Sequence, residues 1–186
     1  MSNGSESLIP CHMPTEMAHF LSSDKLAYIC TIDTENKPLV SPVFFVWNFG
    51  SNKCEIGFCS SRKSKFINNL LNNPFLSLTI DEKHPSDTLG NQGIMVDGFV
   101  EFYTDSHHSS KMIDDLRSKY ARYKNYKSFQ KLLARFDVII YVRITNVVHW
   151  RGPFFSRHAC PIHADLEAFG VGHWKEILKN NIKTSI

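Results

Sequence analysis

The sequence lacks any long apolar stretch. Among its 186 residues, no apolar run approaches the roughly 20 that a membrane helix needs. The first residues contain no basic segment followed by an apolar one, so no secretory signal is expected. The cysteines are odd in number and irregularly spaced, which is typical of a reducing compartment (Cys11, Cys30, Cys54, Cys59 and Cys160). These absences predict a cytoplasmic protein with no membrane partner.

Signature motifs of several large enzyme classes are also missing. The chain has no Walker loop, no GxGxxG before a helix, no HExxH and no GxSxG. The net charge of +3 is too small to indicate a polyanionic partner. With 42% hydrophobic and 21% charged residues, the composition is that of an ordinary globular domain with one core.

The positive charge is nevertheless uneven. Residues 111–135 hold eight basic and two acidic side chains, a local charge of +6 that leaves −3 for the remainder. We interpret this segment as a solvated helix face, and a docking surface for something anionic is the alternative. Tyr120, Tyr123 and Tyr126 recur at a spacing of three, which predicts one helix face packed on the domain. Stacking on nucleic-acid bases is the alternative, and we expect no nucleic-acid partner.

Short runs rich in β-branched and aromatic residues predict strands joined by polar loops. Loops shorter than a crossover helix imply antiparallel neighbours. Helical spacing is expected in a short segment from Pro14, in 61–73, in 106–136 with an interruption near Asn125, and in 174–181. The six expected strands cover residues 26–32, 39–47, 54–60, 75–80, 93–102 and 137–148. The fold class is therefore mainly β with flanking helices, in the form of a small six-stranded antiparallel barrel.

Pro42 conflicts with its place inside the second run. Proline removes a ladder donor and is confined to edges, bulges or the first residue of a strand. We expect that something other than a strand lies beside it.

The turn at residues 60–65 has the chemistry of an anion site. Ser60, Ser61 and Ser64 supply three hydroxyls, and Arg62, Lys63 and Lys65 supply three cations, at an expected helix start. Phosphate is bound by this combination of charge, donors and helix N–H groups. A solvated basic turn is the alternative reading.

The order of these elements resembles the pyridoxamine 5′-phosphate oxidase-like family of FMN-binding split barrels, which includes deazaflavin (F420) and heme-related members. The likeness runs from about residue 17 to 151, through Val40-Ser41-Pro42-Val43, Phe58-Cys59-Ser60, Ser64-Lys65, Asn73-Pro74 and Val96-Asp97-Gly98. It implies a six-stranded split barrel at 14–151, after a flexible segment 1–13. The extension 152–186 would pack on the barrel or on a dimer partner.

The resemblance also implies a homodimer with FMN at the subunit interface. Strand two would lie along the flavin, strand three and the basic turn would hold the phosphate, and further residues would reach the ribityl chain or ring. Carried over by position, the cofactor-binding residues are Ser41, Pro42, Val43, Phe44, Phe58, Cys59, Ser60, Arg62, Lys63, Ser64, Lys65, Asn69, Gln92 and Trp150.

Two departures from the family pattern bear on the site. The family's lysine commonly stands eight residues before the proline, where this chain has Phe66, with Lys65 one position earlier. The phosphate register therefore stays open by one residue. Ser41 replaces an arginine of the oxidases that act on pyridoxamine phosphate, so we expect a different small-molecule substrate.

Other candidate chemistries are weaker. His158, Cys160 and His163 lack a paired CxxC or HxxxH element, so no metal site is predicted. Cys59 is interpreted as a packing residue, with a redox thiol as the alternative. The first hypothesis is an FMN-dependent oxidoreductase that passes hydride or electrons from a nicotinamide-type donor to a small acceptor. The alternatives are an F420-dependent reductase, a heme-handling member with His149 as ligand, or a flavin-binding or partner-binding dimer without turnover.

Overall fold

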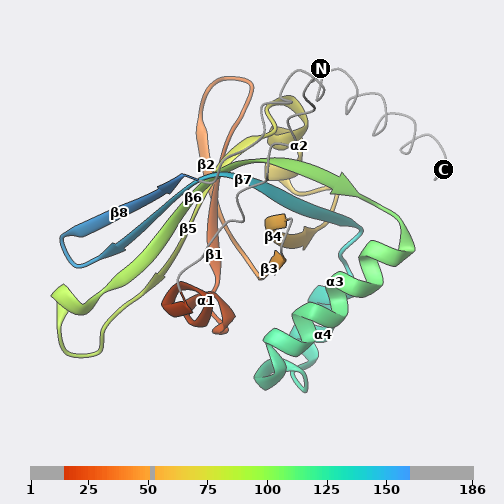
Figure 1. The fold of residues 1–186 in the computed structure, drawn as a ribbon. Helices are drawn as coiled ribbons and strands as arrows, with labels where there is room; N and C mark the ends of the chain where they lie inside the picture. Colours follow the sequence, from red (N-terminus) through yellow and green to blue (C-terminus); the bar gives the residue numbers. More distant parts are fainter. Residues whose placement is uncertain (1–14, 51–52, 160–186) are drawn as a thin grey trace, which may run out of the picture.

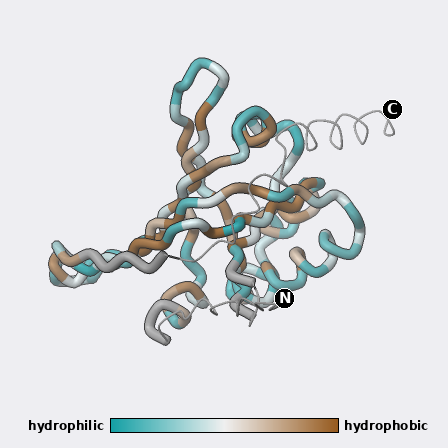
Figure 2. Tube along the Cα trace, turned by 45° about the horizontal axis from the view of Figure 1, so that its top comes forward, coloured by the Kyte–Doolittle hydropathy of each residue, from teal (hydrophilic) through white to brown (hydrophobic). Residues whose placement is uncertain are grey.

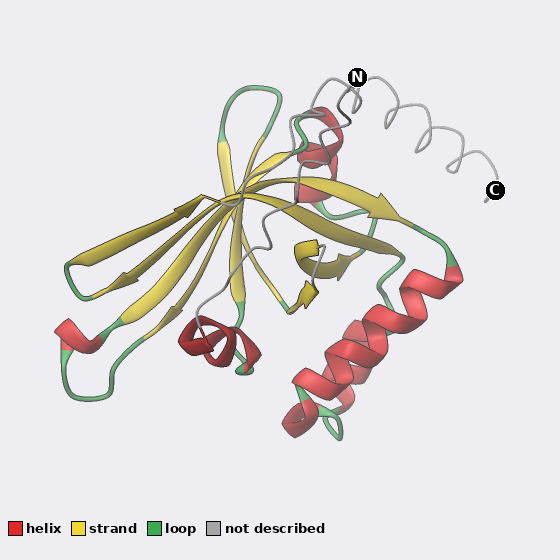
Figure 3. Cartoon of the chain, viewed as in Figure 1, coloured by secondary structure: helices red, strands yellow, loops and turns green. Residues whose placement is uncertain are grey.

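The computed structural model describes residues 15–50 and 53–159, and it is mainly β (Figures 1 and 3). Eight strands form one curled sheet in which all neighbours are antiparallel. The strands are β1 (Ala27–Ile32), β2 (Pro38–Val43), β3 (Phe45–Gly50), β4 (Lys53–Ser60), β5 (Phe75–Glu82), β6 (Gln92–Tyr103), β7 (Val138–Arg151) and β8 (Phe154–Ala159). The helices are α1 (Thr15–Ser22), α2 (Lys65–Asn72), η1 (Thr88–Gly90), α3 (Ser106–Lys119), η2 (Ala121–Tyr123) and α4 (Lys127–Leu133). The fold class and the interrupted helix at 106–136 are confirmed.

The count of six strands is wrong, for two reasons. The run 39–47 is not one strand but two, because Phe44 separates β2 from β3. In addition, β8 pairs with the end of β7 after a two-residue turn, in which Gly152 adopts a φ of 54°. The expected segment 1–13, the helix 174–181 and most of the extension 152–186 lie outside the described residues.

The break at Phe44 closes the sheet on itself. The strand order is β2-β1-β5-β6-β7-β4-β3, so the two strands that flank Phe44 lie at opposite ends of it. Val43 and Phe45 are two residues apart and can be separated by only about 7 Å. The sheet must therefore curl until its two edges meet, which is the geometry of a barrel.

The interior of this curled sheet is the main core. Ile29, Phe45, Phe58, Ile80 and Ile94 are all but inaccessible to solvent and belong to one cluster. Helix α2 adds Phe66, Ile67 and Leu70 to the same cluster, and its apolar residues recur at a helical spacing. Figure 2 shows hydrophobic residues gathered where the strands cross, whereas the loop between β1 and β2 is hydrophilic.

Outside the barrel, the sheet has a covered part and a bare part. Helices α3 and α4 pack on the β3–β4–β7 part, where Met112, Leu116 and Tyr120 are fully buried. The outer face of β1, β2, β5 and β6 instead exposes Tyr28, Val40, Met95 and neighbouring apolar residues. No helix within the described residues has the length and hydrophobicity of a membrane span.

Candidate functional site

The turn from Ser60 to Lys65 lies at the rim of the barrel, between the end of β4 and the start of α2. The hydroxyls of Ser60 and Ser64 are 2.9 Å apart, and the Ser64 N–H donates to the Ser61 carbonyl at 2.9 Å. The Asp137 N–H donates to the carbonyl of Ser60 and ties the turn to the start of β7. These bonds hold both hydroxyls on one short, ordered stretch of chain.

Three cationic side chains surround the turn and meet two carboxylates. Arg62 donates its backbone N–H to Asp137 at 2.8 Å, and its Nε lies 3.9 Å from the same carboxylate. The Nζ of Lys65 is 4.0 Å from the Oδ2 of Asp33. The Lys63 side chain is exposed, and within the described residues its ammonium makes no hydrogen bond or ion pair. The cluster keeps a net charge of +1, which favours an anion.

Asp33 is held ionised by its own loop. The N–H groups of Lys37 and Glu35 donate to its Oδ1 at 2.9 Å, and the first of these bonds is the main reason that its pKa is lowered. The charge of Lys65 adds to that effect. Sequence reasoning missed Asp33 and Asp137 as neighbours of the turn. Their positions immediately after β1 and immediately before β7 were the available signal.

Helix α2 presents its N-terminus to this turn. Ser64 is the N-cap in an extended conformation and makes no side-chain cap hydrogen bond, and the first turn of α2 carries no acidic side chain. The positive end of the helix dipole therefore adds to the cations. The Asn69 amide is buried and donates to the Thr31 hydroxyl at 3.0 Å, so it joins α2 to β1.

The second-strand residues of the predicted site point in different directions. Pro42 lies on the exposed face of β2 opposite Tyr28, and β2 is an edge strand. Ser41 and Val43 lie on the other face, where Val43 belongs to the core. Phe44 turns away to the helices and packs edge-to-face on Tyr120 with a centroid distance of 4.8 Å.

Two residues from β4 are in packed surroundings. Phe58 lies fully inside the barrel, 6.2 Å from the ring of Phe66. Cys59 faces the opposite side and packs in the cluster beneath α3. Burial raises the pKa of the Cys59 thiol, which disfavours the reactive thiolate. Their roles toward a cofactor stay predictions.

The last two predicted residues lie far from the basic turn within one chain. Gln92 opens β6 and donates to Glu82 at 3.0 Å, while Trp150 is near the end of β7. Ser60 pairs with Val138 at the start of β7. Twelve residues of strand separate Val138 from Trp150, which corresponds to as much as about 40 Å. The structure thus brings Ser60, Arg62, Lys63, Ser64, Lys65 and Asn69 together and leaves Gln92 and Trp150 apart from them.

The described residues contain no group of three or more His, Cys, Asp and Glu side chains suited to a metal ion. Of the residues weighed as metal ligands from the sequence, Cys160 and His163 lie outside the described part of the chain. Cys30 and Cys59 are free thiols.

Comparisons with solved structures agree on the fold. A heme binding protein from Mycobacterium smegmatis is 20% identical, with a TM-score of 0.58 over 80% of this chain and 60% of that chain. An F420 reductase is 20% identical, with a TM-score of 0.56 over 73% and 98%. A conserved hypothetical protein from Mycobacterium tuberculosis is 16% identical, with a TM-score of 0.61 over 77% and 87%. At these identities the likeness concerns the fold alone.

Family assignment comes from the sequence itself. No curated protein sequence matches the chain. The family model described as pyridoxamine 5′-phosphate oxidase matches residues 13–150, well over half of the chain and nearly all of the described barrel. The chain therefore belongs to the pyridoxamine 5′-phosphate oxidase family.

Proposed function

We propose that this protein is a cytoplasmic, homodimeric FMN-binding oxidoreductase that passes hydride or electrons from a nicotinamide-type donor to a small acceptor. The observation that carries this proposal is the cationic turn at Ser60–Lys65, placed at the N-terminus of α2. Arg62, Lys63 and Lys65 neutralise charge there, and the two serine hydroxyls can donate to phosphate oxygens.

The bare face of the sheet supplies an apolar surface next to this turn. Lys65 reaches the end of β1 at Asp33. From there, Ile32, Cys30 and Tyr28 run along the outer face of β1, beside Pro38, Val40 and Pro42 of β2. A cofactor with an anionic tail and a flat aromatic ring system fits a cationic turn that borders an apolar face. Pro42 has no N–H to satisfy on this edge strand, so a ring can lie against it.

The separation of the predicted residues argues for a second copy. A single ligand at the Ser60–Lys65 turn cannot reach Gln92 and Trp150 of the same chain across the length of β7. In a two-fold dimer, those residues are contributed by the partner. The exposed apolar side chains Tyr28, Val40, Phe75 and Met95 are the surface that such a dimer would cover.

FMN, when bound, supplies the hydride or electron transfer, and the chain's own residues bind, orient and shield it. The turn would fix the phosphate, and the apolar face would exclude water from one side of the ring. No acid–base pair is required of the protein for that transfer.

The proposal is tested first with the purified full-length protein. Its chromophore is identified by mass and by absorption spectrum, and the FMN-free protein is titrated with FMN by flavin fluorescence. Lys65→Ala should weaken FMN binding about 10- to 150-fold, since a charge-assisted phosphate contact is worth roughly 1.5–3 kcal/mol. Lys131→Ala on α4, an exposed lysine away from the turn, is the matched control.

The register and the cofactor class have separate outcomes. If Arg62→Ala or Lys63→Ala weakens binding and Lys65→Ala does not, the phosphate register is shifted. If F420 co-purifies, F420 takes the place of FMN at the same turn. If heme co-purifies and His149→Ala alters its absorption spectrum, the protein is a heme-handling member. If NAD(P)H does not reduce the bound flavin, the protein is a flavin-binding dimer without turnover. An FMN affinity unchanged in all three variants would contradict the site.

A further inference from the structure

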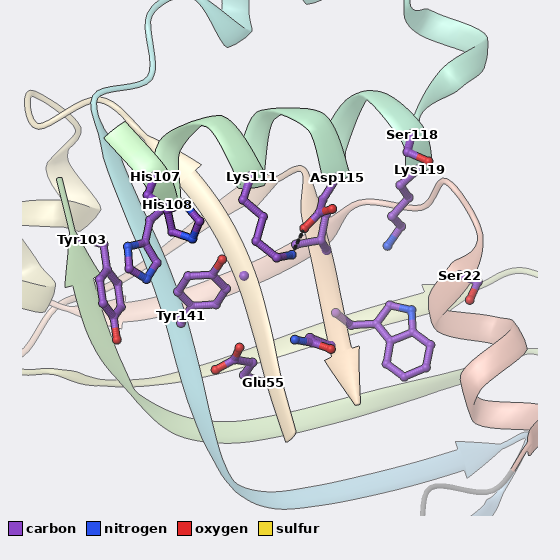
Figure 4. Close-up of a pocket in the computed structure, with 14 residues that line it drawn as sticks. Ser22, Glu55, Tyr103, His107, His108, Lys111, Asp115, Ser118, Lys119 and Tyr141 are labelled. Atoms are coloured by element: carbon purple, nitrogen blue, oxygen red, sulfur yellow. Dashed lines mark hydrogen bonds and ion pairs between the residues drawn. The ribbon is translucent and has the colours of Figure 1, made fainter. Parts of the chain in front are cut away.

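A cavity lies on the opposite, covered side of the sheet and takes no part in the proposed FMN site. It has a volume of about 510 Å³, within the range of small-molecule pockets. Helix α3 forms its roof, and β3, β4 and β7 form its floor (Figure 4). Gly57 lets Met112 and the Tyr141 ring approach its backbone closely, because a Cβ at that position would lie 2.6 Å from Met112 and 2.8 Å from the ring.

One end of the cavity is aromatic and rigid. Tyr103 and Tyr141 meet edge-to-face at 5.7 Å, and the His108 ring stacks on Tyr103 at 4.1 Å. The Tyr103 hydroxyl donates to the buried Glu101, which also accepts from Arg143 at 2.9 Å. These contacts fix the ring faces that a flat ligand would meet.

The other end of the cavity holds an unsatisfied amine. Lys119 points from α3 toward the strands, on the side where Ser22 and Ser118 lie (Figure 4). Its Nζ is shielded from water, and no hydrogen-bond acceptor reaches it within the described residues. Its near neighbour is the Phe45 ring, whose centroid is 3.1 Å away. A buried donor without an acceptor is costly, and a ligand oxygen would remove that cost.

Charges around the cavity define which end an anion can occupy. Lys111 and Asp115 of α3 pair with each other, whereas Glu55 of β4 lies at the aromatic end. A carboxylate placed beside Glu55 would be repelled, and one placed beside Lys119 would be attracted. The groups facing Lys119 or lining its cavity are Asp24, Lys25, Glu55, Tyr103, His107, His108, Lys111, Asp115 and Tyr141.

We propose that this cavity binds a small aromatic carboxylate, with the carboxylate accepting a hydrogen bond from Lys119 and the ring directed toward the Tyr141 end. Charge commits the ligand to one orientation, because Glu55 lies at the aromatic end and the Lys119 end holds a buried amine without an acceptor. This inference is independent of the proposed FMN site, which uses the Ser60–Lys65 turn and the bare outer face.

Binding of such an anion should take up a proton above neutral pH. Burial, together with the nearby charge of Lys25, lowers the pKa of Lys119 to about 7, and Asp24 opposes the shift. A bound carboxylate favours the ammonium form. At pH 8 the amine is mostly neutral without ligand, so binding consumes close to one proton.

The experiment titrates the full-length protein with 2-naphthoate by calorimetry, and with 2-naphthalenemethanol as the uncharged analogue. The unaltered protein should prefer the carboxylate by about 10- to 100-fold at pH 7. Lys119→Met should abolish that preference while retaining weak binding of both compounds, and Lys131→Met should leave it unchanged. At pH 8, the binding enthalpy should vary with the ionisation enthalpy of the buffer, and Lys119→Met should remove this dependence.

Three results would overturn the proposal. These are no binding of 2-naphthoate, equal affinity for the two probes in the unaltered protein, or an unchanged preference in Lys119→Met. Competition by FMN would show that the cavity is the cofactor's own and not a separate site. Because the probe comparison uses the unaltered protein, a folding defect in the variant cannot produce the same result. Loss of FMN binding in Lys65→Ala with retained 2-naphthoate binding would separate the two sites.

Discussion

The two halves of the barrel's outer surface are both built from antiparallel strands, but helices cover only one of them. On β3, β4 and β7, helices α3 and α4 cover the sheet and bury Met112, Leu116 and Tyr120. On β1, β2, β5 and β6, comparable apolar side chains remain exposed, with Val40 at 61% and Tyr28 at 42%. The covered half is completed within one chain, whereas the bare half has the composition of a surface that another molecule completes.

The covered half should therefore be the more sensitive to truncation. Tyr120 is fully buried, and its hydroxyl donates to the Lys25 carbonyl at 2.6 Å and accepts the Phe45 N–H at 3.2 Å. Tyr120→Ala should lower the free energy of unfolding by about 3–5 kcal/mol, as for other large aromatic truncations. Urea denaturation followed by circular dichroism measures it.

The matched change on the bare half is Tyr28→Ala. At protein concentrations too low for a dimer, it should change the free energy of unfolding by no more than about 0.5 kcal/mol. Equal losses for Tyr28→Ala and Tyr120→Ala would mean that the bare face is already closed by the chain itself.

A charge on the bare half should instead act on association. Val40→Lys places an ammonium in the middle of the exposed apolar face, and two-fold symmetry would place two of them in one interface. We expect the dimer dissociation constant to rise by about 30- to 1000-fold, equivalent to roughly 2–4 kcal/mol. Sedimentation equilibrium measures this, with Thr34→Lys in the exposed β1–β2 loop as the control. A monomeric unaltered protein would contradict the proposed dimer.

Much of the fold could be predicted because strand and helix periods are local properties. The break at Phe44 could not, since residues 39–47 are apolar except for Ser41 and only the closure of the sheet decides where the chain changes edges. Strand β8 does have a signal in the sequence. Gly152-Pro153 is a turn dipeptide between two strand-like runs, and the φ of 54° at Gly152 suits glycine.

The basic turn could be recognised from six consecutive residues, but its carboxylate neighbours are distant in sequence. Lys119 shows the same limit of sequence-based prediction, because its burial depends on contacts that are distant in sequence. It belongs to the basic segment 111–135 that we interpreted as a solvated helix face, and that interpretation is wrong for this residue. Its neighbour Tyr120 is buried as expected, but the prediction of one packed helix face is wrong, because Tyr123 lies in η2 and Tyr126, before α4, is 61% exposed. Only the way α3 lies across β3 and β4 decides which lysine of a basic helix turns inward.

A stabilising substitution of that lysine tests whether the covered half is optimised for stability. Lys119→Met keeps the length of the side chain and removes a buried amine that has no acceptor, so it should stabilise the protein by about 1–3 kcal/mol at pH 6. The pKa of Lys119 falls from its ordinary 10.5 to about 7 on folding, so between pH 7 and pH 10.5 the unfolded chain binds a proton that the folded protein does not. The free energy of unfolding of the unaltered protein should therefore rise with pH across that range, and the gain in stability from Lys119→Met should shrink accordingly. Thermal unfolding at pH 6 and pH 9 measures both, with Lys131→Met as the control. A pH-independent gain would place the Lys119 amine in water, and a loss of stability would show that its contact with the Phe45 ring outweighs its burial.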